Sequence, residues 1–316
     1  MKAIKIPHHK DPEIAISYAF FAILLLLPLF GGRWISNAGL YLMLYSIMGY
    51  SWNIFSGLTN IVSFGHAVYF GLGAYATFIT VRDLGLVFPF SAILSTALAS
   101  AMCGAIAYIV SYPFLGLRGL SFAICTLAFA EFMAILFTNT QLVERGREVA
   151  FIPAQTDLLT NYYMLFVLLF LIWTVFWKSR NSKLGLALIA IGENEDAASS
   201  LGIDVFSFIR KAYVISAICM GIAGACLPYI VLSATVETLF GVERSLMPLV
   251  ICIIGGRGSI LGPLLGAIIM HFLAEYLRAT FTYLHWVFLG AIVIAVHIFE
   301  PLGIVGYLRR MFGGTR

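Results

Sequence analysis

Charge is scarce in this sequence. Asp, Glu, Lys and Arg make up 11% of its 316 residues, whereas soluble domains carry about 25%. This scarcity excludes a water-soluble domain, and the 61% apolar share supports the same conclusion. The net charge of +4 is a topology signal rather than a sign of affinity for nucleic acid, because Lys and Arg gather in the cytoplasmic loops of membrane proteins. We therefore expect a polytopic protein in a lipid bilayer, with no nucleic-acid partner.

The usual signatures of chemistry are also missing. The phosphate-binding pattern G-x-x-x-x-G-K-[ST] does not occur, so any ATP hydrolysis is expected on separate subunits. The five cysteines show no CxxC spacing, and no HxxxH or HExxH pattern occurs. The sequence therefore predicts no catalytic, cofactor-binding or metal-binding residues and no enzyme activity. The histidines of the apolar segments are interpreted as packing residues: His66, His271, His285 and His297.

Long apolar runs fill most of the chain. About 20 apolar residues cross a bilayer as a helix, and hydropathy predicts about ten crossings. The predicted fold class is all-α, a polytopic helical membrane protein. The first run has no cleavage site after it and is expected to remain as a helix. The predicted spans lie near 14–30, 36–56, 61–80, 90–112, 119–139, 161–177, 211–234, 243–256, 260–277 and 282–299.

Basic residues orient these spans. Lysines before the first span and arginines after the last one place both termini in the cytoplasm. The segment after the sixth span contains Lys178, Arg180 and Lys183, so it is expected on the same side. The connection around 140–160 is then external, and its Arg145 and Arg147 depart weakly from the charge rule. We expect a single transmembrane domain over 1–316 in the cell (inner) membrane, with a cytoplasmic loop at 178–210.

Two spans contain many glycines. Residues 57–75 read GLTNIVSFGHAVYFGLGAY, and residues 255–267 read GGRGSILGPLLGA. Gly-interrupted segments in corresponding halves are typical of transporters that have broken helices and an internal inverted repeat. Glycines also permit close helix contact, as in a GxxxG pattern. The sequence alone supports both interpretations equally.

A few polar residues lie within apolar segments. Glu131 ends the run CTLAFAE inside the fifth span, and a carboxylate in a membrane is costly. We therefore expect Glu131 to lie in the protein interior, paired or facing a polar cavity. The other polar residues either line a passage or hold helices together. The candidate residues of the translocation path are Asn53, Asn60, Ser63, His66, Thr126 and Glu131.

The stretch from Ser182 to Ile203 predicts two short helices outside the membrane. Asn194 is a favourable N-cap, and acidic residues follow it in the first turn, where the helix dipole favours negative charge. Gly202 is expected to end the second helix. A helix of about two turns is unstable alone, so its apolar face, predicted as Ala197, Ala198 and Leu201, is expected to dock on a partner. The plainer alternative is an ordinary solvated loop.

The segment Glu195-Asp196-Ala197-Ala198-Ser199-Ser200-Leu201-Gly202 resembles the EAA loop of ABC importer permeases. The blocks GLTNIVSFGHAVYFGLGAYA, LRGLSFAICTLAFAE, RNSKLGLALIAIGENEDAASSLGI, KAYVISAICMGIAGA and GGRGSILGPLLGA are similar to permeases of the branched-chain amino acid uptake family. The M-type subunit is the nearest kind. The resemblance implies that the ATPase-coupling residues are Glu193, Asn194, Glu195, Asp196, Ala197, Ala198, Leu201 and Gly202.

The resemblance also implies a function and a set of partners. The expected function is one half of the passage of an ATP-driven importer for small solutes, most simply branched-chain amino acids, with other amino acids, amides or urea as alternatives. The expected partners are two cytoplasmic ABC ATPase subunits, a paralogous H-type permease or a second copy, and an external substrate-binding protein. Where M-type permeases have a Gly-rich TGG segment, this chain has TNTQLVERGREVAFIPAQ. A stand-alone ion-coupled secondary transporter is the main alternative, and it leaves the helix after Asn194 without a role.

Overall fold

The computed structural model describes residues 12–30, 32–139, 149–154, 156–280, 287, 290–291 and 303–312. Several predicted features lie outside the described residues. They are the lysines of the amino terminus, Arg145 and Arg147, most of the tenth predicted span, His285 and His297.

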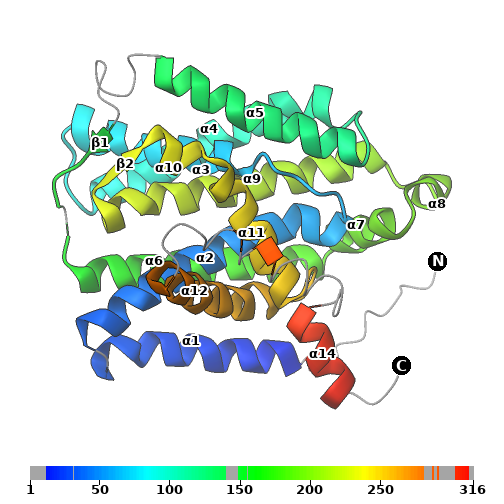
Figure 1. The fold of residues 1–316 in the computed structure, drawn as a ribbon. Coiled ribbons are helices and arrows are strands. Elements are labelled where there is room, and N and C mark those ends of the chain that lie inside the picture. The colour runs from blue at the N-terminus through cyan, green and yellow to red at the C-terminus, as the bar shows by residue number, and fades with distance from the viewer. Residues whose placement is uncertain are drawn as a thin grey trace.

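The described chain is almost entirely helical. In Figure 1, α1 and α5 lie along opposite sides of the molecule, and α10, α11 and α12 lie across one face between them. The elements are α1 (Pro12–Phe30), α2 (Arg33–Trp52), the π-helix η1 (Asn53–Gly57), α3 (His66–Phe78), the π-helix η2 (Ile79–Asp83), α4 (Phe90–Phe114), α5 (Leu120–Asn139), β1 (Val149–Phe151), α6 (Leu158–Arg180), α7 (Lys183–Glu193), α8 (Glu195–Ser200), α9 (Val205–Val231), β2 (Ser233–Thr235), α10 (Val236–Phe240), α11 (Val242–Gly255), α12 (Gly262–Thr280) and α14 (Gly303–Phe312).

Six helices of the described residues are long and apolar enough to cross a membrane. The prediction of a helical membrane protein is confirmed, whereas the count of about ten crossings is not. Helix α2 is not among the six, although it has 20 residues. Most of its side chains are buried inside the protein, so they do not need the hydropathy of a lipid-facing helix. The six segments are Glu13–Phe30, Phe90–Phe114, Leu120–Asn139, Leu158–Arg180, Val205–Val231 and Val236–Gly255.

The centre of the molecule is the contact between α3 and α9. A Cβ atom added at Gly73 would lie 1.9 Å from the carbonyl oxygen of Gly221, and one added at Gly224 would lie 1.9 Å from that of Phe70. Only glycine permits this backbone approach. Thr77 adds a cross-link, since its hydroxyl donates to the carbonyl of Ala225 at 2.7 Å. The GxxxG type of close packing is therefore present here, between two buried helices.

The bundle has two distinct ends (Figure 1). We call them the α8 end, where α7 and α8 lie, and the ribbon end, where β1 and β2 lie. The ribbon is antiparallel and pairs Val149 with Thr235 and Phe151 with Ser233. It joins the segment before α6 to the segment after α9.

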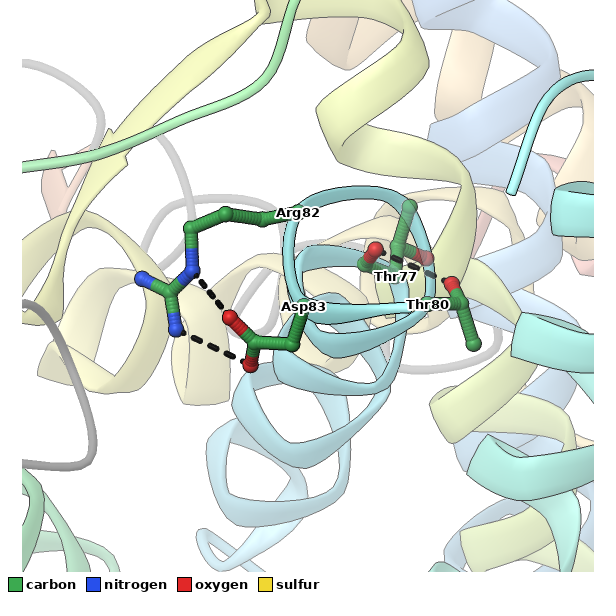
Figure 2. A network of polar contacts seen from close by, with 4 residues as sticks. All are labelled: Thr77, Thr80, Arg82 and Asp83. Carbon is green, nitrogen blue, oxygen red and sulfur yellow. Dashed lines mark hydrogen bonds and ion pairs between the residues drawn. The ribbon is translucent and has the colours of Figure 1, made fainter. Parts of the chain in front are cut away.

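The C-terminal end of α3 also lies near the ribbon end, because α3 and α9 run side by side there. Figure 2 shows its polar contacts. The Thr80 hydroxyl donates to the carbonyl of Thr77 at 3.0 Å. Arg82 and Asp83 form an ion pair with 2.7 Å between Nε and Oδ1. Both interactions join residues that are neighbours along the chain, so they do not connect one element to another.

Candidate functional site

Two interruptions of helical structure lie towards the α8 end. The first break is residues 60–65, before α3, and the second break is residues 256–261, between α11 and α12. Asn53 of η1 joins η1 to the second break through both ends of its amide. Its Nδ2 donates to the carbonyl of Ser259 at 3.1 Å, and its Oδ1 accepts from the backbone N–H of Gly258 at 2.8 Å. The side chain of Asn53 is completely buried.

A serine occupies a similar role in each break. The Ser63 hydroxyl accepts from the N–H of Gly65, and the Ser259 hydroxyl accepts from the N–H of Gly262, each just at the start of the following helix. The carbonyl of Ser63 accepts from the indole of Trp52 at 3.0 Å, as that of Ser259 accepts from Asn53. The serine-glycine similarity of the two sequence segments therefore corresponds to a similarity of hydrogen bonding.

Two further side chains reach the second break, and sequence reasoning missed them. The N–H of Ile260 donates to Oε2 of Glu13, in the first turn of α1, at 2.9 Å. The carbonyl of the same residue accepts from the hydroxyl of Tyr50 at 2.6 Å. Glu13 is 7% exposed. The available signal was the pair of acidic residues, Asp11 and Glu13, just before the first apolar run.

Other predicted path residues also form hydrogen bonds between elements. His66 Nε2 lies 2.8 Å from the hydroxyl of Ser216 on α9, which donates to the carbonyl of Ser51. The Thr126 hydroxyl accepts from the N–H of Phe64 at 3.1 Å. Asn53, Ser63, His66 and Thr126 are all fully buried. In the described conformation, the side chains of Asn53, His66 and Thr126 join one element to another, whereas the Ser63 hydroxyl bonds within its own segment.

Glu131 lies elsewhere than expected. We predicted an interior position, but its side chain is exposed on the surface of this chain. Helix α5 buries the face that carries Phe122, Thr126, Ala130 and Met133. Consecutive residues of a helix point about 100° apart, so Glu131 is turned away from that face. The surroundings of the Glu131 carboxylate therefore depend on what covers the outer face of α5.

The α7–α8 unit forms as the sequence predicts. Asn194 caps α8, since its Oδ1 accepts from the N–H of Ala197 at 2.9 Å. Gly202 has φ +83°, the left-handed conformation that glycine adopts easily. The N–H of the next residue, Ile203, donates to the carbonyl of Ala198. The predicted start and end of the second short helix are both confirmed.

The outward face of α8 differs from the predicted one. Ala198 is 2% exposed and packs into the core of its own chain, whereas Leu201 is 82% exposed. Ala197 is exposed as well. Positions i and i+4 share a helix face, but the residue after i does not, so Ala197 and Leu201 point outward together. Assigning Ala198 to the same face was wrong.

The acidic start of α8 has a partner within the chain. Glu195 pairs with Arg118, in the turn between α4 and α5, at 2.9 Å. The other polar or acidic candidates of this segment, Glu193, Asn194 and Asp196, are exposed. Arg118 was not predicted. It is the single basic residue of a short Gly-flanked turn, which is the signal that sequence reasoning overlooked.

Helix α7 connects α8 to the first break. The Asn60 amide donates to the carbonyl of Gly192 at 3.2 Å. A Cβ atom at Gly192 would lie 3.0 Å from the carbonyl oxygens of Leu58 and Thr59, so the two backbones are in close contact. A series of contacts therefore leads from α8 through α7 to the first break. The π-helix η1 lies just before that break in the chain, and its Asn53 contacts the second break.

The remaining predicted residues give partial answers. His271 lies against Tyr41 with nearly parallel rings, 6.2 Å between centroids, which agrees with a packing role. Cys103, Cys219, Cys226 and Cys252 are buried and Cys125 is half-buried, all as free thiols.

Comparison with known proteins assigns the family. The model of the family described as branched-chain amino acid transport system / permease component matches residues 34–297. The chain is 27% identical over 298 residues to the high-affinity branched-chain amino acid transport system permease protein LivM of Escherichia coli, covering 84% of this chain and 69% of that protein. It is 24% identical over 285 residues to LivH of the same organism, covering 83% and 91%. No solved structure matches significantly. The chain belongs to the family of branched-chain amino acid transport system permease components.

Proposed function

We propose that the chain is a permease subunit of an ATP-driven importer for branched-chain amino acids. The family and the printed names of the LivM and LivH relatives support the solute class. The M-type assignment is favoured by the match to LivM. The chain supplies the passage, and two ABC ATPase subunits in the cytoplasm supply the energy.

The topology that we propose has about ten spans with both termini in the cytoplasm. The α8 end is assigned to the cytoplasm, because Lys178, Arg180 and Lys183 lie around the start of α7. The ribbon end is then external and faces the substrate-binding protein. The matching hydrogen bonds of Ser63 and Ser259 support an internal inverted repeat with a broken helix in each half.

The observation on which this function depends most is the exposure of Leu201. A leucine that is 82% exposed on a capped helix of six residues has no packing role in its own chain. Burying a Leu side chain contributes about 2 kcal/mol, which is a reason for the α8 face of Ala197 and Leu201 to enter a groove on an ATPase subunit. Glu193, Asn194 and Asp196 then lie beside that groove, and Gly202 turns the chain back towards α9.

The second passage-forming subunit is proposed to be a paralogous H-type permease, or else a second copy of this chain. The exposed Glu131 supports a covering subunit on the outside of α5, because a carboxylate against lipid at mid-depth costs several kcal/mol.

The test is the variant Leu201→Arg. We expect it to reach the membrane at the normal level, and to lose ATPase association and uptake of a labelled branched-chain amino acid, because a charge replaces the docking leucine. Val87→Arg is the matched control, since Val87 is also an exposed apolar residue, outside the regular helices. Co-purification of the ATPase with each variant gives the answer. Normal association and uptake with Leu201→Arg would show that α8 is not the coupling element, as expected of an ion-coupled transporter.

A further inference from the structure

One charged residue of a membrane-spanning segment has a defined geometry and no assigned role. Arg244 lies in the first turn of α11, within the candidate span Val236–Gly255. Its Nε donates to the carbonyl of Thr238 at 2.9 Å. Its guanidinium carbon lies 5.4 Å from the centre of the Phe70 ring, a cation–π distance. The guanidinium group is therefore held in place on two sides.

These two contacts do not neutralise the charge of Arg244. Among the residues that the structure describes, the ion pairs are Arg82–Asp83 and Arg118–Glu195, and neither includes Arg244. The side chain is half-buried. An unpaired arginine in a span is costly and normally faces a water-filled cavity or an anion. The remaining N–H groups of Arg244 have the fork geometry that binds a carboxylate in two places.

The depth of Arg244 follows from contacts between α3 and α5. Gly65, beside the start of α3, lies against Thr126 of α5, and Tyr75 lies 4.7 Å from Phe137 between ring centroids. Both helices rise about 1.5 Å per residue, so Phe70 of α3 is level with Glu131 of α5. Arg244, over the Phe70 ring, is at the same level.

Two charged side chains of the spans, Arg244 and Glu131, thus lie at the same level. In this chain Arg244 is half-buried and Glu131 is exposed. Helix α5 lies along one edge of the molecule, and α10 and α11, which contact it, lie across the adjoining face (Figure 1). Lipid is a poor environment for either charge. The half-buried Arg244, which is in neither described ion pair, is therefore expected to face a polar space enclosed with another subunit.

Resting on the proposed function, we propose that Arg244 is a solute-binding residue on the wall of the passage, where its guanidinium group pairs with the α-carboxylate of the transported amino acid. Every branched-chain amino acid presents this carboxylate whatever its side chain. A fixed guanidinium group therefore recognises the whole class and leaves the choice among side chains to other residues.

The experiment uses the complete transporter, with its second permease chain, ATPases and binding protein, in proteoliposomes. Arg244→Gln is expected to lower the initial uptake of a labelled branched-chain amino acid about tenfold or more, because hydrogen bonds to charged groups are strong. Co-purification of the second permease chain should stay normal. Arg82→Gln, at an exposed local ion pair, is the matched control and should transport normally.

A charge-specific readout separates solute binding from a structural role. Arg244→Cys is treated with a cationic or an anionic water-soluble methanethiosulfonate, with the unmodified chain as background for the native thiols. The cationic reagent should restore part of the uptake, and the anionic one should not. Normal uptake with Arg244→Gln, or equal effects of the two reagents, would overturn the proposal. Loss of the second permease from Arg244→Gln would instead assign Arg244 to that subunit and also overturn it. Absence of uptake by the unmodified transporter would contradict the proposed function itself.

Discussion

The two ends of the bundle are joined in different ways. At the α8 end, side chains from distant parts of the sequence hold backbone groups of other segments: Asn53 holds the second break, Glu13 holds the N–H of Ile260, and Asn60 holds α7. At the ribbon end, three-residue strands pair with each other, and Arg82 pairs with its neighbour Asp83. Bonds between elements occur there too, since Asn161 of α6 donates to the carbonyl of Tyr229 and the Tyr229 hydroxyl donates to Ser91 of α4. The first end therefore holds the two breaks, whereas the second holds the ends of regular helices.

This difference bears on how a transporter of this kind could couple ATP hydrolysis to movement. In the proposed function, a displacement of α8 would pass to α7, from α7 to the first break at Asn60, and along the chain to η1, whose Asn53 holds the second break. The bonds of the ribbon end join the ribbon and the ends of α4, α6 and α9, and they do not reach either break. Substitutions of equal chemistry should therefore have larger effects at the α8 end, and the following predictions test that comparison.

The largest effect is expected for Asn53→Leu. The substitution leaves the carbonyl of Ser259 and the N–H of Gly258 without partners in a buried site, and each such loss costs about 1–3 kcal/mol. Thr80→Val is the control, because Thr80 is also fully buried but its hydroxyl donates to the carbonyl of Thr77, only three residues earlier in the chain (Figure 2). Thermal unfolding in detergent should show a clear loss of stability for Asn53→Leu and little change for Thr80→Val. Equal losses would mean that the two ends are held equally.

A smaller effect is expected for Asn194→Ala. The loss of an N-cap costs about 1 kcal/mol, and α8 is too short to tolerate it without fraying. ATPase affinity should fall about fivefold, measured by titrating the ATPase onto the permease pair in nanodiscs. Thr235→Ala removes the cap of α10 near the ribbon end and should leave that affinity unchanged. A similar decrease in ATPase affinity in both variants would show that the N-cap of α8 has no specific role in docking the ATPase.

The smallest change in stability is expected for the two ion pairs. Arg118 is 71% exposed and Arg82 is 30% exposed, and exposed pairs contribute about 0.5 kcal/mol or less. Arg118→Gln should unfold at the normal temperature yet alter solute-stimulated ATP hydrolysis, because it frees the start of α8 from the turn between α4 and α5. Arg82→Gln should change neither quantity. Unaltered ATP hydrolysis in Arg118→Gln would show that the turn between α4 and α5 does not take part in coupling α8 to the two breaks.

Local features of the site were predictable from the sequence. The cap at Asn194 and the turn at Gly202 follow from residue types whose conformational preferences extend over a few residues. The breaks in the two glycine-rich segments were also visible, although their contact with each other was not. The serine in each segment turned out to mark the same kind of hydrogen bond.

Features that depend on which helix packs against which were not predictable. Ala198 and Leu201 are equally apolar, and only the position of α8 against its own chain buries the first and exposes the second. Glu131 was expected inside because burial was judged from its own segment, whereas the face of α5 that packs on the protein is the opposite one. The count of crossings is not confirmed for a related reason, since α2 is buried by protein and lacks the hydropathy of a lipid-facing span.

The contact between Glu13 and Ile260 has a consequence for biosynthesis. The two residues are 247 positions apart, and a ribosome adds about 5–20 residues per second. The first helix therefore enters the membrane and waits roughly 10–50 seconds before its carboxylate can accept the N–H of Ile260. A nascent chain that stops before the second break lacks this bond, so α1 is less firmly held in truncated chains than in finished ones.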